Sequence, residues 1–516
     1  MLPEDPRDRR IAQLEAENAE LRALLQKAME QIAAITQRLN DLEAKNAALV
    51  AENAVLRAEN TELKAENAEL KARFTGNSRN SSRPPSSDPP WEKLRKTRGK
   101  KNAPKRLRGG QPGHRGHRRE PLPPEQVDCI EHHRPARCPR CGASLSGADP
   151  RPRVHQVIDL LDFRPFVTEH RLHALTCAAC GATARGTLPP ETPKGLLSDR
   201  IVALLSLFTG KYKLSKRSAR ELLQDCFGLT VSAALVTRAE QQTSVALAPP
   251  VSAAREHVKA APIVNADETG WFEGCKRAWL WVAATLNVTV FLIVRSRSAE
   301  MAKALLGESF SGFLVSDRYC GYLWVNDERR QFCWAHILRA LQGIIDRGGT
   351  GARTGKQLLT TAIGCFREWY RVRDGTRSLA SFQELVRLPW GYIDSFEDGL
   401  RRGALSEDPK VARFCRELLS KKECLWRFVD VPGIEPTNNR AERSLRHAVL
   451  WRRSSFGTQS ERGSRYVERM LTTVETLRLQ KRPVLAFLMD ALRAHRLGLA
   501  APSLLPQAAD ATPAAA

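Results

Sequence analysis

Three carboxylates occupy positions from which they can hold divalent cations. Asp267 ends an apolar stretch that begins at Pro262, Asp317 ends the apolar run at 312–316, and Glu442 falls early in a predicted helix. Carboxylate oxygens are hard ligands that suit Mg²⁺ or Mn²⁺. Two such cations about 3.5 to 4 Å apart can activate a hydroxyl and stabilise a leaving oxygen during attack on a phosphodiester. The three acids therefore predict metal-dependent phosphoryl transfer.

Two other acids compete for the same role. Glu268 follows Asp267 directly, and alternation along a strand turns neighbouring side chains to opposite faces. Glu435 precedes Pro436 and lies outside the predicted helix. Both observations favour Glu442 as the third ligand. A purely structural role is the ordinary alternative for any single acid.

The elements that must position these acids follow a definite order. Three runs rich in β-branched and aromatic residues predict consecutive strands, at 262–271, 277–285 and 288–294. Ser298 then precedes a helical pattern, and the run at 312–316 predicts a fourth strand. This order is typical of a ribonuclease H-like α/β core, in which the first and fourth strands lie side by side. We therefore expect Asp267 and Asp317 to be neighbours.

The chain after Asp317 continues this core and then interrupts it. Residues 330–336 predict a fifth strand running into a helix at Leu338, and His336 either approaches the metal site or caps that helix. A mostly helical insertion is expected at about 340–430. The core resumes at 433, and the basic residues of the following helix, Arg440, Arg443 and Arg446, recur at a spacing that suits DNA phosphates.

The composition favours a polyanionic partner. A chain of 516 residues that is 42% hydrophobic holds several domains, and its net charge of +24 with a pI near 9.9 predicts nucleic-acid binding. No stretch reaches the length of about 18 apolar residues that a membrane span needs, and the N-terminus lacks the apolar core of a signal peptide. We expect a cytoplasmic protein without a membrane partner.

Residues 1–75 carry a sustained heptad repeat. The d positions are Leu14, Leu21, Ala28, Ile35, Leu42, Leu49, Leu56, Leu63 and Leu70, and the a positions are Ile11, Asn18, Leu25, Ile32, Leu39, Asn46, Asn53, Asn60 and Asn67. Recurrent Asn at a and opposite charges at g and e favour a parallel two-stranded coiled coil. We expect a homodimer or higher oligomer. A single solvated helix, or pairing with another protein, is the alternative.

A basic arm is expected at 76–125. It is poor in large apolar residues, and five of its cations are candidate DNA ligands: Lys100, Lys101, Lys105, Arg106 and Arg108. Such an arm follows phosphates without reading sequence. A solvated linker is the alternative.

Two Cys-x-x-Cys-Gly knuckles predict a zinc-ribbon-like module at 126–192. Their thiolates belong to Cys138 and Cys141 and to Cys177 and Cys180, and four thiolates close the coordination sphere of a structural Zn²⁺. The two knuckles are farther apart than the usual run of about 15 to 20 residues, and a hairpin of residues 154–160 with 167–176 is expected to fill the gap.

Residues 193–245 predict a helix-turn-helix outline. Gly228 breaks the helical pattern, and a second helix opens at Ser232. If this unit reads DNA, Ser232, Thr237 and Arg238 face the groove. An ordinary helical hairpin has the same pattern.

Four short motifs resemble, in order, those of bacterial DDE transposases of the insertion-sequence-66 group. They are Ala-Asp-Glu-Thr-Gly-Trp at 266–271, Ser-Asp-Arg-Tyr-Cys-Gly-Tyr at 316–322, Cys-Trp-Ala-His at 333–336 and Pro-Thr-Asn-Asn-Arg-Ala-Glu-Arg at 436–443. The resemblance covers nearly the whole chain and implies a ribonuclease H-like catalytic domain at 255–495. It also implies that Asp267, Asp317 and Glu442 bind two Mg²⁺ or Mn²⁺ ions.

The resemblance implies an enzyme that cuts DNA at the ends of its element and joins the 3′-hydroxyls to target DNA. The implied partners are the terminal repeats and the target, with accessory transposition proteins as further candidates. A non-catalytic dimeric DNA-binding regulator is one alternative, and a metal-dependent nuclease without joining activity is another. Residues 496–516 are expected to form a disordered tail.

Overall fold

The computed structural model describes residues 6–75, 122–147, 149–150, 152–159 and 164–506. The arm residues Lys100, Lys101, Lys105, Arg106 and Arg108 lie outside these ranges, as do residues 507–516. The chain divides into two compact units, of which one contains Met1–Asp88, Arg339–Leu359 and Leu405–Ala412. The other contains the sheet and the three acids.

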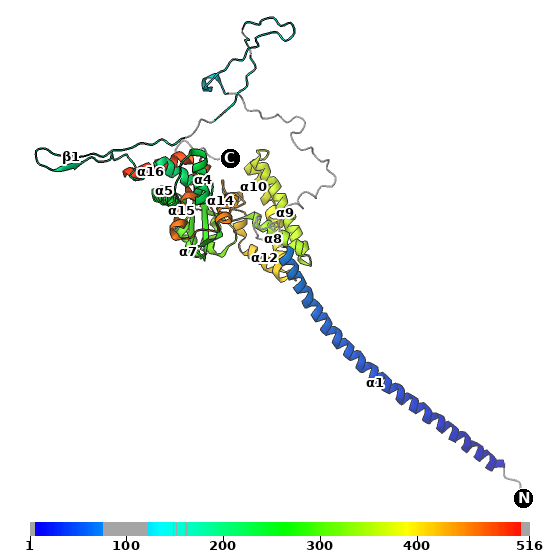
Figure 1. The fold of residues 1–516 in the computed structure, drawn as a ribbon. Helices are drawn as coiled ribbons and strands as arrows, with labels where there is room; N and C mark the ends of the chain where they lie inside the picture. Colours follow the sequence, from blue (N-terminus) through cyan, green and yellow to red (C-terminus); the bar gives the residue numbers. More distant parts are fainter. Residues whose placement is uncertain (1–5, 76–121, 148, 151, 160–163, 507–516) are drawn as a thin grey trace. The chain divides into compact units, whose positions relative to one another are not determined.

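Helix α1 (Pro6–Thr75) is a single continuous helix, blue in Figure 1. Its described side chains are all exposed, and the d-position residues Leu42 and Leu49 are 63% and 56% exposed. A long exposed apolar stripe on a helix is the surface that a coiled-coil partner covers. Pairing of two copies remains a prediction.

A five-stranded sheet forms the centre of the second unit, in the order β5-β4-β3-β6-β7. The strands are β3 (Ile263–Glu273), β4 (Lys276–Ala284), β5 (Thr289–Val294), β6 (Phe313–Ser316) and β7 (Arg330–Phe332). The first three are antiparallel neighbours, whereas β6 runs parallel to β3 and β7 parallel to β6. The predicted adjacency of the first and fourth strands is confirmed.

The outer edge of β5 is covered by α15 (Glu461–Leu479). The backbone N–H groups of Thr289 and Phe291 donate to the hydroxyls of Thr476 and Thr472, each at 3.1 Å. The N–H of Ile293 donates to the carboxylate of Glu468. Four helical residues rise about 6 Å and two strand residues rise nearly 7 Å, so alternate strand positions meet every fourth helical residue.

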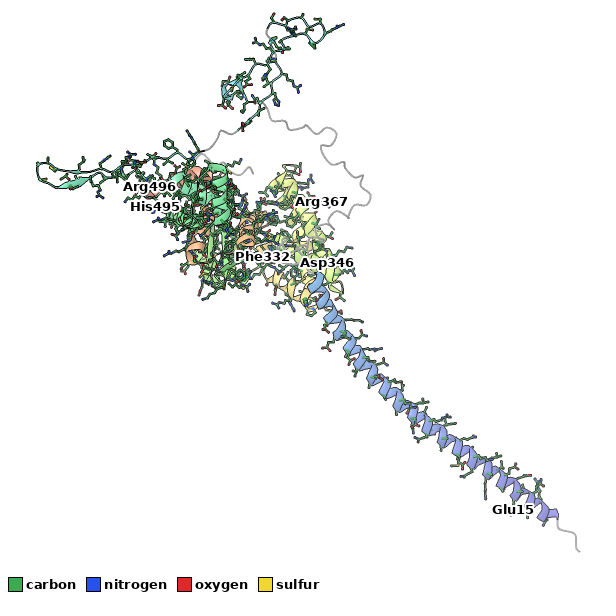
Figure 2. All side chains as sticks on the ribbon, viewed as in Figure 1. Glu15, Phe332, Asp346, Arg367, His495 and Arg496 are labelled. Atoms are coloured by element: carbon green, nitrogen blue, oxygen red, sulfur yellow. The ribbon has the colours of Figure 1, made fainter. Side chains whose placement is uncertain are left out.

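Seven further helices complete this core. Their bounds are α3 (Asp199–Ser206), α4 (Lys216–Phe227), α5 (Ala233–Ala246), α6 (Ala248–Lys259), α7 (Ala299–Leu306), α14 (Asn439–Ser455) and α16 (Val484–Leu497). The first and last are tied by Arg496, labelled in Figure 2, whose Nη2 donates to Oδ2 of Asp199 at 2.7 Å. A half-buried bidentate pair of this kind fixes both helix ends.

The expected helical insertion is present between β7 and α14. Its helices are α8 (Trp334–Arg347), α9 (Gly351–Arg373), α10 (Leu379–Arg387), α11 (Tyr392–Ala404), α12 (Pro409–Ser420) and α13 (Arg427–Asp430). The helix predicted from Leu338 begins earlier, at Trp334, because the carbonyl of Cys333 already accepts from His336 N at 3.1 Å. The buried indole of Trp334 packs on Phe366, Phe396 and Trp426 and donates to the carbonyl of Leu425 at 2.7 Å.

The expected hairpin of residues 154–160 with 167–176 is wrong. The strands are β1 (Ala174–Thr176) and β2 (Thr183–Arg185), which pair with each other on the two sides of the second knuckle. Hydrogen bonds within the knuckle close this turn, because Cys177 N donates to the carbonyl of Ala182 at 2.8 Å and Gly181 N donates to that of Cys177 at 2.9 Å.

The disordered tail expected at 496–516 is contradicted near Leu504, within the described residues 496–506. Leu504 is fully buried, and its carbonyl accepts from Nε2 of Gln480 at 2.8 Å. The chain around Leu504 therefore packs against the core, whereas Leu499 is 62% exposed. Among the described residues, no helix combines the length and the apolar character needed to cross a membrane.

Candidate functional site

The β3–β6 ladder brings Asp267 and Asp317 to the same level of the sheet. Asn265 pairs with Val315 in this parallel ladder, and each acid lies two residues farther along its own chain. Neighbouring strands are about 4.8 Å apart, and residues in register on parallel strands face the same side. Two carboxylates that the sequence separates by 50 positions are therefore adjacent, as the strand order predicts.

Electrostatics place Glu442 in the same group. Burial raises the pKa of the Asp267 carboxyl well above its usual range, and the negative charges of Glu268, Asp317 and Glu442 raise it further. The N–H of Glu268 donates to Oδ1 of Asp267 at 2.9 Å and opposes this rise. Burial is the larger cause of this rise, and the like charges of the neighbouring carboxylates add to it. The three acids and Glu268 form one negative cluster.

Glu442 reaches this cluster because the start of α14 is bonded to β3. Asn438, which precedes the helix, is fully buried. Its Nδ2 donates to the carbonyl of Ala266 at 2.7 Å, and its Oδ1 accepts from Nδ2 of Asn265 at 3.1 Å. The N–H of Glu442 donates to the carbonyl of Asn438 at 3.1 Å. Glu442 is thus in the first turn of a helix fixed beside Asp267.

Asp317 is held by the loop that follows β6. The N–H of Tyr319 donates to Oδ1 of Asp317 at 2.9 Å. The fully buried guanidinium of Arg330 approaches the carbonyl of Asp317 and the hydroxyl of Ser316, each at 3.4 Å. The Tyr319 N–H and the buried Arg330 guanidinium therefore fix the orientation of Asp317, directly after the end of β6.

Glu268 is engaged elsewhere. Its Oε1 accepts from Nη2 of Arg297 at 2.6 Å, and its Oε2 accepts from the hydroxyl of Tyr322 at 2.8 Å. Arg297 also lies over the rings of Trp279 and Tyr319, 4.7 and 3.8 Å from their centroids. The other rival, Glu435, is 40% exposed and lies 3.9 Å from Arg373. Glu268 is therefore bonded within the fold, whereas Glu435 has a partly exposed ion pair.

The donor set of the three acids fits hard divalent cations. Asp267, Asp317 and Glu442 offer only carboxylate oxygens, which are the ligands that Mg²⁺ and Mn²⁺ take. The negative charges that add to burial in raising the pKa of Asp267 are the charges that such cations would neutralise.

A second cluster, the Cys333–His336–Glu442 cluster, shares one of these acids. The Sγ of Cys333, a ring nitrogen of His336 and a carboxylate oxygen of Glu442 all lie within 4.8 Å of one another. Burial raises the pKa of the Cys333 thiol to about 11. Sequence reasoning considered His336 alone and missed Cys333, although the Cys-x-x-His spacing was visible.

The predicted DNA-binding residues on α14 differ in accessibility. Arg443 and Arg446 are exposed, whereas Arg440 is half-buried, and burial lowers its pKa. All three follow Asn438 on the helix that carries Glu442. Cationic side chains therefore flank the third acid.

The helix-turn-helix outline is present as α4, a left-handed Gly228 and α5. Arg238 is exposed, but the other two candidate residues make internal bonds. The hydroxyl of Ser232 accepts from Leu235 N at 3.2 Å, and that of Thr237 accepts from Nζ of Lys216 at 2.9 Å. Ser232 therefore acts as a helix cap.

Each cysteine knuckle is closed by hydrogen bonds within its own turn. Gly142 N donates to the carbonyl of Cys138, and Gly181 N donates to that of Cys177, each at 2.9 Å, with both glycines at positive φ. Backbone N–H groups within each turn lower the pKa of Cys138 and of Cys177. Within the described part of the chain, the two knuckles do not join as one four-cysteine group.

Two family models match parts of this chain. The family model described as "Transposase IS66 family" matches residues 194–466, and a "Family of unknown function (DUF6444)" matches residues 3–120. Two proteins of Sinorhizobium fredii are similar to this chain. "Uncharacterized protein y4hP" is 25% identical over 417 residues, which are 73% of this chain and 74% of the relative. "Uncharacterized protein y4qI" is 26% identical over 252 residues, which are 43% of this chain and 46% of the relative.

The first family model spans more than half of the 516 residues, from the start of the helical region through α14 into α15. It includes Asp267, Asp317 and Glu442. The chain belongs to the IS66 transposase family.

Proposed function

We propose that this protein is a DDE-type DNA transposase. Its ribonuclease H-like core cuts DNA at the ends of the element and joins the new 3′-hydroxyls to target DNA. The observation that carries the proposal is the meeting of Asp267, Asp317 and Glu442, whose charges act on one another. Asp267 lies within β3 beside the end of β6, Asp317 directly follows β6, and Glu442 lies in the first turn of α14. Membership of a transposase family supports the same reaction.

The three acids are proposed to hold two Mg²⁺ or Mn²⁺ ions. When bound, such a pair lowers the pKa of an attacking water or 3′-hydroxyl and stabilises the leaving oxygen. The protein's own contribution is orientation. Asn438 fixes the helix of Glu442 to β3, and the Tyr319 N–H and Arg330 hold Asp317. Ligands that do not move between steps need no reorganisation during the reaction.

DNA binding is proposed to come mainly from outside this site. The arm at 76–125 and Arg238 supply positive charge, and Arg443 and Arg446 extend that charge along α14 toward the cut strand. Phosphate contacts of this kind position DNA without reading its sequence. The coiled coil is proposed to join two copies, and the knuckle cysteines are proposed to hold one structural Zn²⁺.

The proposal is tested by incubating the purified protein with Mg²⁺, DNA carrying an element end, and a target duplex. Strand transfer predicts a joined product whose formation stops when EDTA is added. Cleavage without joined product identifies a nuclease. Specific binding with neither product identifies a non-catalytic regulator, and either result refutes the proposed transposase.

A further inference from the structure

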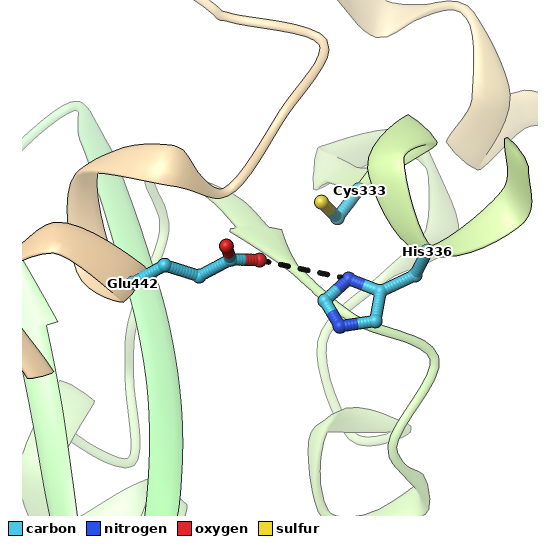
Figure 3. A group of neighbouring side chains, drawn as sticks. All are labelled: Cys333, His336 and Glu442. Carbon is cyan, nitrogen blue, oxygen red and sulfur yellow. Dashed lines mark ion pairs between the residues drawn. The ribbon is translucent and has the colours of Figure 1, made fainter. Parts of the chain in front are cut away.

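The Cys333–His336–Glu442 cluster gathers a sulfur, a nitrogen and an oxygen in one place. Nδ1 of His336 lies 3.8 Å from Oε1 of Glu442, and Figure 3 shows both side chains pointing toward each other beside Cys333. Cys333 and His336 are three positions apart at the start of α8, a spacing that puts two side chains on one face of a helical turn. The third ligand comes from a different helix, α14.

This donor set selects a different cation from that of the three acids. Mg²⁺ takes oxygen ligands, whereas Zn²⁺ takes thiolate, imidazole and carboxylate, with bonds of about 2.0 to 2.3 Å. A tetrahedral ion with those bonds holds its ligand atoms about 3.5 Å apart. The ligand atoms here lie within 4.8 Å of one another. Side-chain rotations that move these atoms by about 1 Å would therefore bring them to the spacing of a bound Zn²⁺. The side chain of Glu442 is 34% exposed.

The surrounding hydrogen bonds hold the ligands as they would a metal site. The N–H of Asn438 donates to Sγ of Cys333 at 3.2 Å, and an N–H···S bond stabilises a thiolate. The carbonyl of the same Asn438 accepts from Glu442 N at 3.1 Å. One buried residue therefore positions two of the three ligands, and outer residues of this kind set metal affinity. The neighbouring Trp334, buried in the insertion, fixes the backbone between Cys333 and His336.

We propose that Cys333, His336 and Glu442 form a Zn²⁺ site with three protein ligands and one position open to water or a phosphate oxygen. The site is separate from the cysteine knuckles. It shares Glu442 with the three acids, so Zn²⁺ held here withdraws that carboxylate from Asp267 and Asp317 and inhibits cleavage. This inhibition rests on the proposed function, whereas the binding of Zn²⁺ does not.

Metal content tests the binding. Full-length wild type, Cys333→Ser and His336→Gln are equilibrated with Zn²⁺, dialysed and assayed for zinc per chain. We expect the wild type to retain one more equivalent than either variant. Cys365→Ser is the matched control, because Cys365 and Cys333 are both 1% exposed. It should retain the wild-type amount, as should Asp267→Asn. Because every variant keeps its knuckles, zinc bound there cancels in each comparison.

Cobalt supplies an independent reading of the same site. With Co²⁺ in place of Zn²⁺, the difference spectrum of wild type minus Cys333→Ser should contain a thiolate-to-cobalt charge-transfer band. Equal metal content and a flat difference spectrum overturn the site. If Cys333→Ser does not fold, His336→Gln decides the matter, since His336 is 25% exposed and its replacement leaves no buried cavity.

The inhibition is tested separately. Cleavage in excess Mg²⁺ is measured while Zn²⁺ is added, and each variant is compared with its own zinc-free rate. The zinc concentration for half-inhibition should rise at least tenfold in His336→Gln and stay unchanged in Cys365→Ser. An unchanged midpoint in His336→Gln overturns the inhibition. If no protein cleaves DNA at all, the proposed function fails, and the zinc content still decides whether the site exists.

Discussion

The side-chain amide of Asn438 donates to the carbonyl oxygen of Ala266 at 2.7 Å, across a sequence separation of 172 residues. The bond joins the start of α14 to β3 one position before Asp267. The whole helical insertion lies between these two residues in the sequence. The position of Glu442 beside Asp267 therefore depends on this contact and not on the path of the insertion.

Replacement of Asn438 by Ala should weaken both the fold and the site. It leaves the buried carbonyl of Ala266 and the amide of Asn265 without their partner, at a cost of about 1 to 3 kcal/mol for each unsatisfied group. We expect a lower Tm and a larger proportional loss of cleavage than of DNA binding. Asn439→Ala, one residue later and exposed, is the control that should change neither. Unchanged Tm and cleavage in Asn438→Ala would contradict the role of this bond.

Charge removal at each proposed metal ligand should abolish chemistry and spare DNA binding. Asp267→Asn, Asp317→Asn and Glu442→Gln keep the side-chain size, so their effect reports charge. Loss of about 3 to 4 kcal/mol of transition-state stabilisation predicts cleavage slower by on the order of 10² to 10³-fold. Cleavage of end DNA is measured beside binding at fixed salt. Near-normal cutting by all three variants would exclude the proposed mechanism.

Glu435→Gln is the proper control for that series, because Glu435 is partly exposed and lies 3.9 Å from Arg373. It should retain most activity. Strand alternation would make Glu268→Gln a second control, because it turns neighbouring side chains to opposite faces. However, the Glu268 carboxylate is buried and accepts hydrogen bonds from Arg297 and Tyr322. We expect Glu268→Gln to lower Tm, measured by thermal unfolding. If Glu435→Gln stops cleavage while Glu442→Gln does not, the third ligand is Glu435.

Glu468 should make the fold less stable at higher pH. Burial raises the pKa of this carboxyl to about 7, although Arg465, the Ile293 N–H, Arg255 and Arg469 all favour the charged form. The unfolded carboxyl has a pKa near 4.3, so the folded state binds the proton more tightly between about pH 4 and 7. This contribution to stability is fully present below that window and is lost as pH rises through 7, by at most about 1.4 kcal/mol per unit.

Urea unfolding at about pH 5.5 and pH 8 measures this effect. In Glu468→Gln the amide oxygen can still accept from the Ile293 N–H, but no proton is released. The variant should therefore lose less stability than the wild type between the two pH values. An equal loss in both proteins would show that Glu468 does not titrate in this range.

The coiled coil should set the oligomeric state. Leu42 and Leu49 are exposed d-position residues on α1, and a charge at either is incompatible with a buried seam. Sedimentation equilibrium should give a dimer or a multiple of it for the wild type and a lower mass for the Leu42→Glu/Leu49→Glu double variant. Ala44→Glu/Ala51→Glu places the same charges on the outer face and should keep the wild-type mass. A monomeric wild type would refute the parallel dimer.

The knuckles should lose their zinc when one thiolate is removed. Cys141→Ser should release one equivalent of zinc per chain and unfold the region around the knuckles, because metal binding and local folding are coupled. Zinc content and protease sensitivity of residues 126–192 are the measurements. Cys129→Ser changes an exposed cysteine outside both knuckles and should keep the zinc. Full zinc content in Cys141→Ser would refute the assignment of Cys141 as a zinc ligand.

The sequence predicts the part of the site that depends on local pattern. Apolar runs ending in Asp267 and Asp317 predict two strands, and the order of elements predicts their adjacency. Only Asp317 follows a strand end, because β3 continues through Asp267 to Glu273 in its pairing with β4. Alternation predicts that Glu268 turns away from Asp267, and the Glu268 carboxylate accepts hydrogen bonds from Arg297 and Tyr322. Each of these inferences uses residues within one element or the order of neighbouring elements.

Local sequence patterns do not predict contacts between segments that are far apart in the chain. Asn438 reads as a polar residue before a helix, and only the fold brings it to Ala266 and Cys333. The same limit explains the missed cluster, since Glu442 joins Cys333 and His336 from another helix. The false hairpin at 154–160 arose because a β-branched run shows strand propensity but does not show which strand it will pair with.

The three side chains of α15 that bond to β5 also have a consequence for association between copies. An edge strand with free N–H groups is a template onto which a strand of another molecule can add. Here Thr289, Phe291 and Ile293 have already given their N–H groups to Thr476, Thr472 and Glu468. This side of the sheet therefore resists aggregation by strand addition, even where many copies are concentrated on one stretch of DNA.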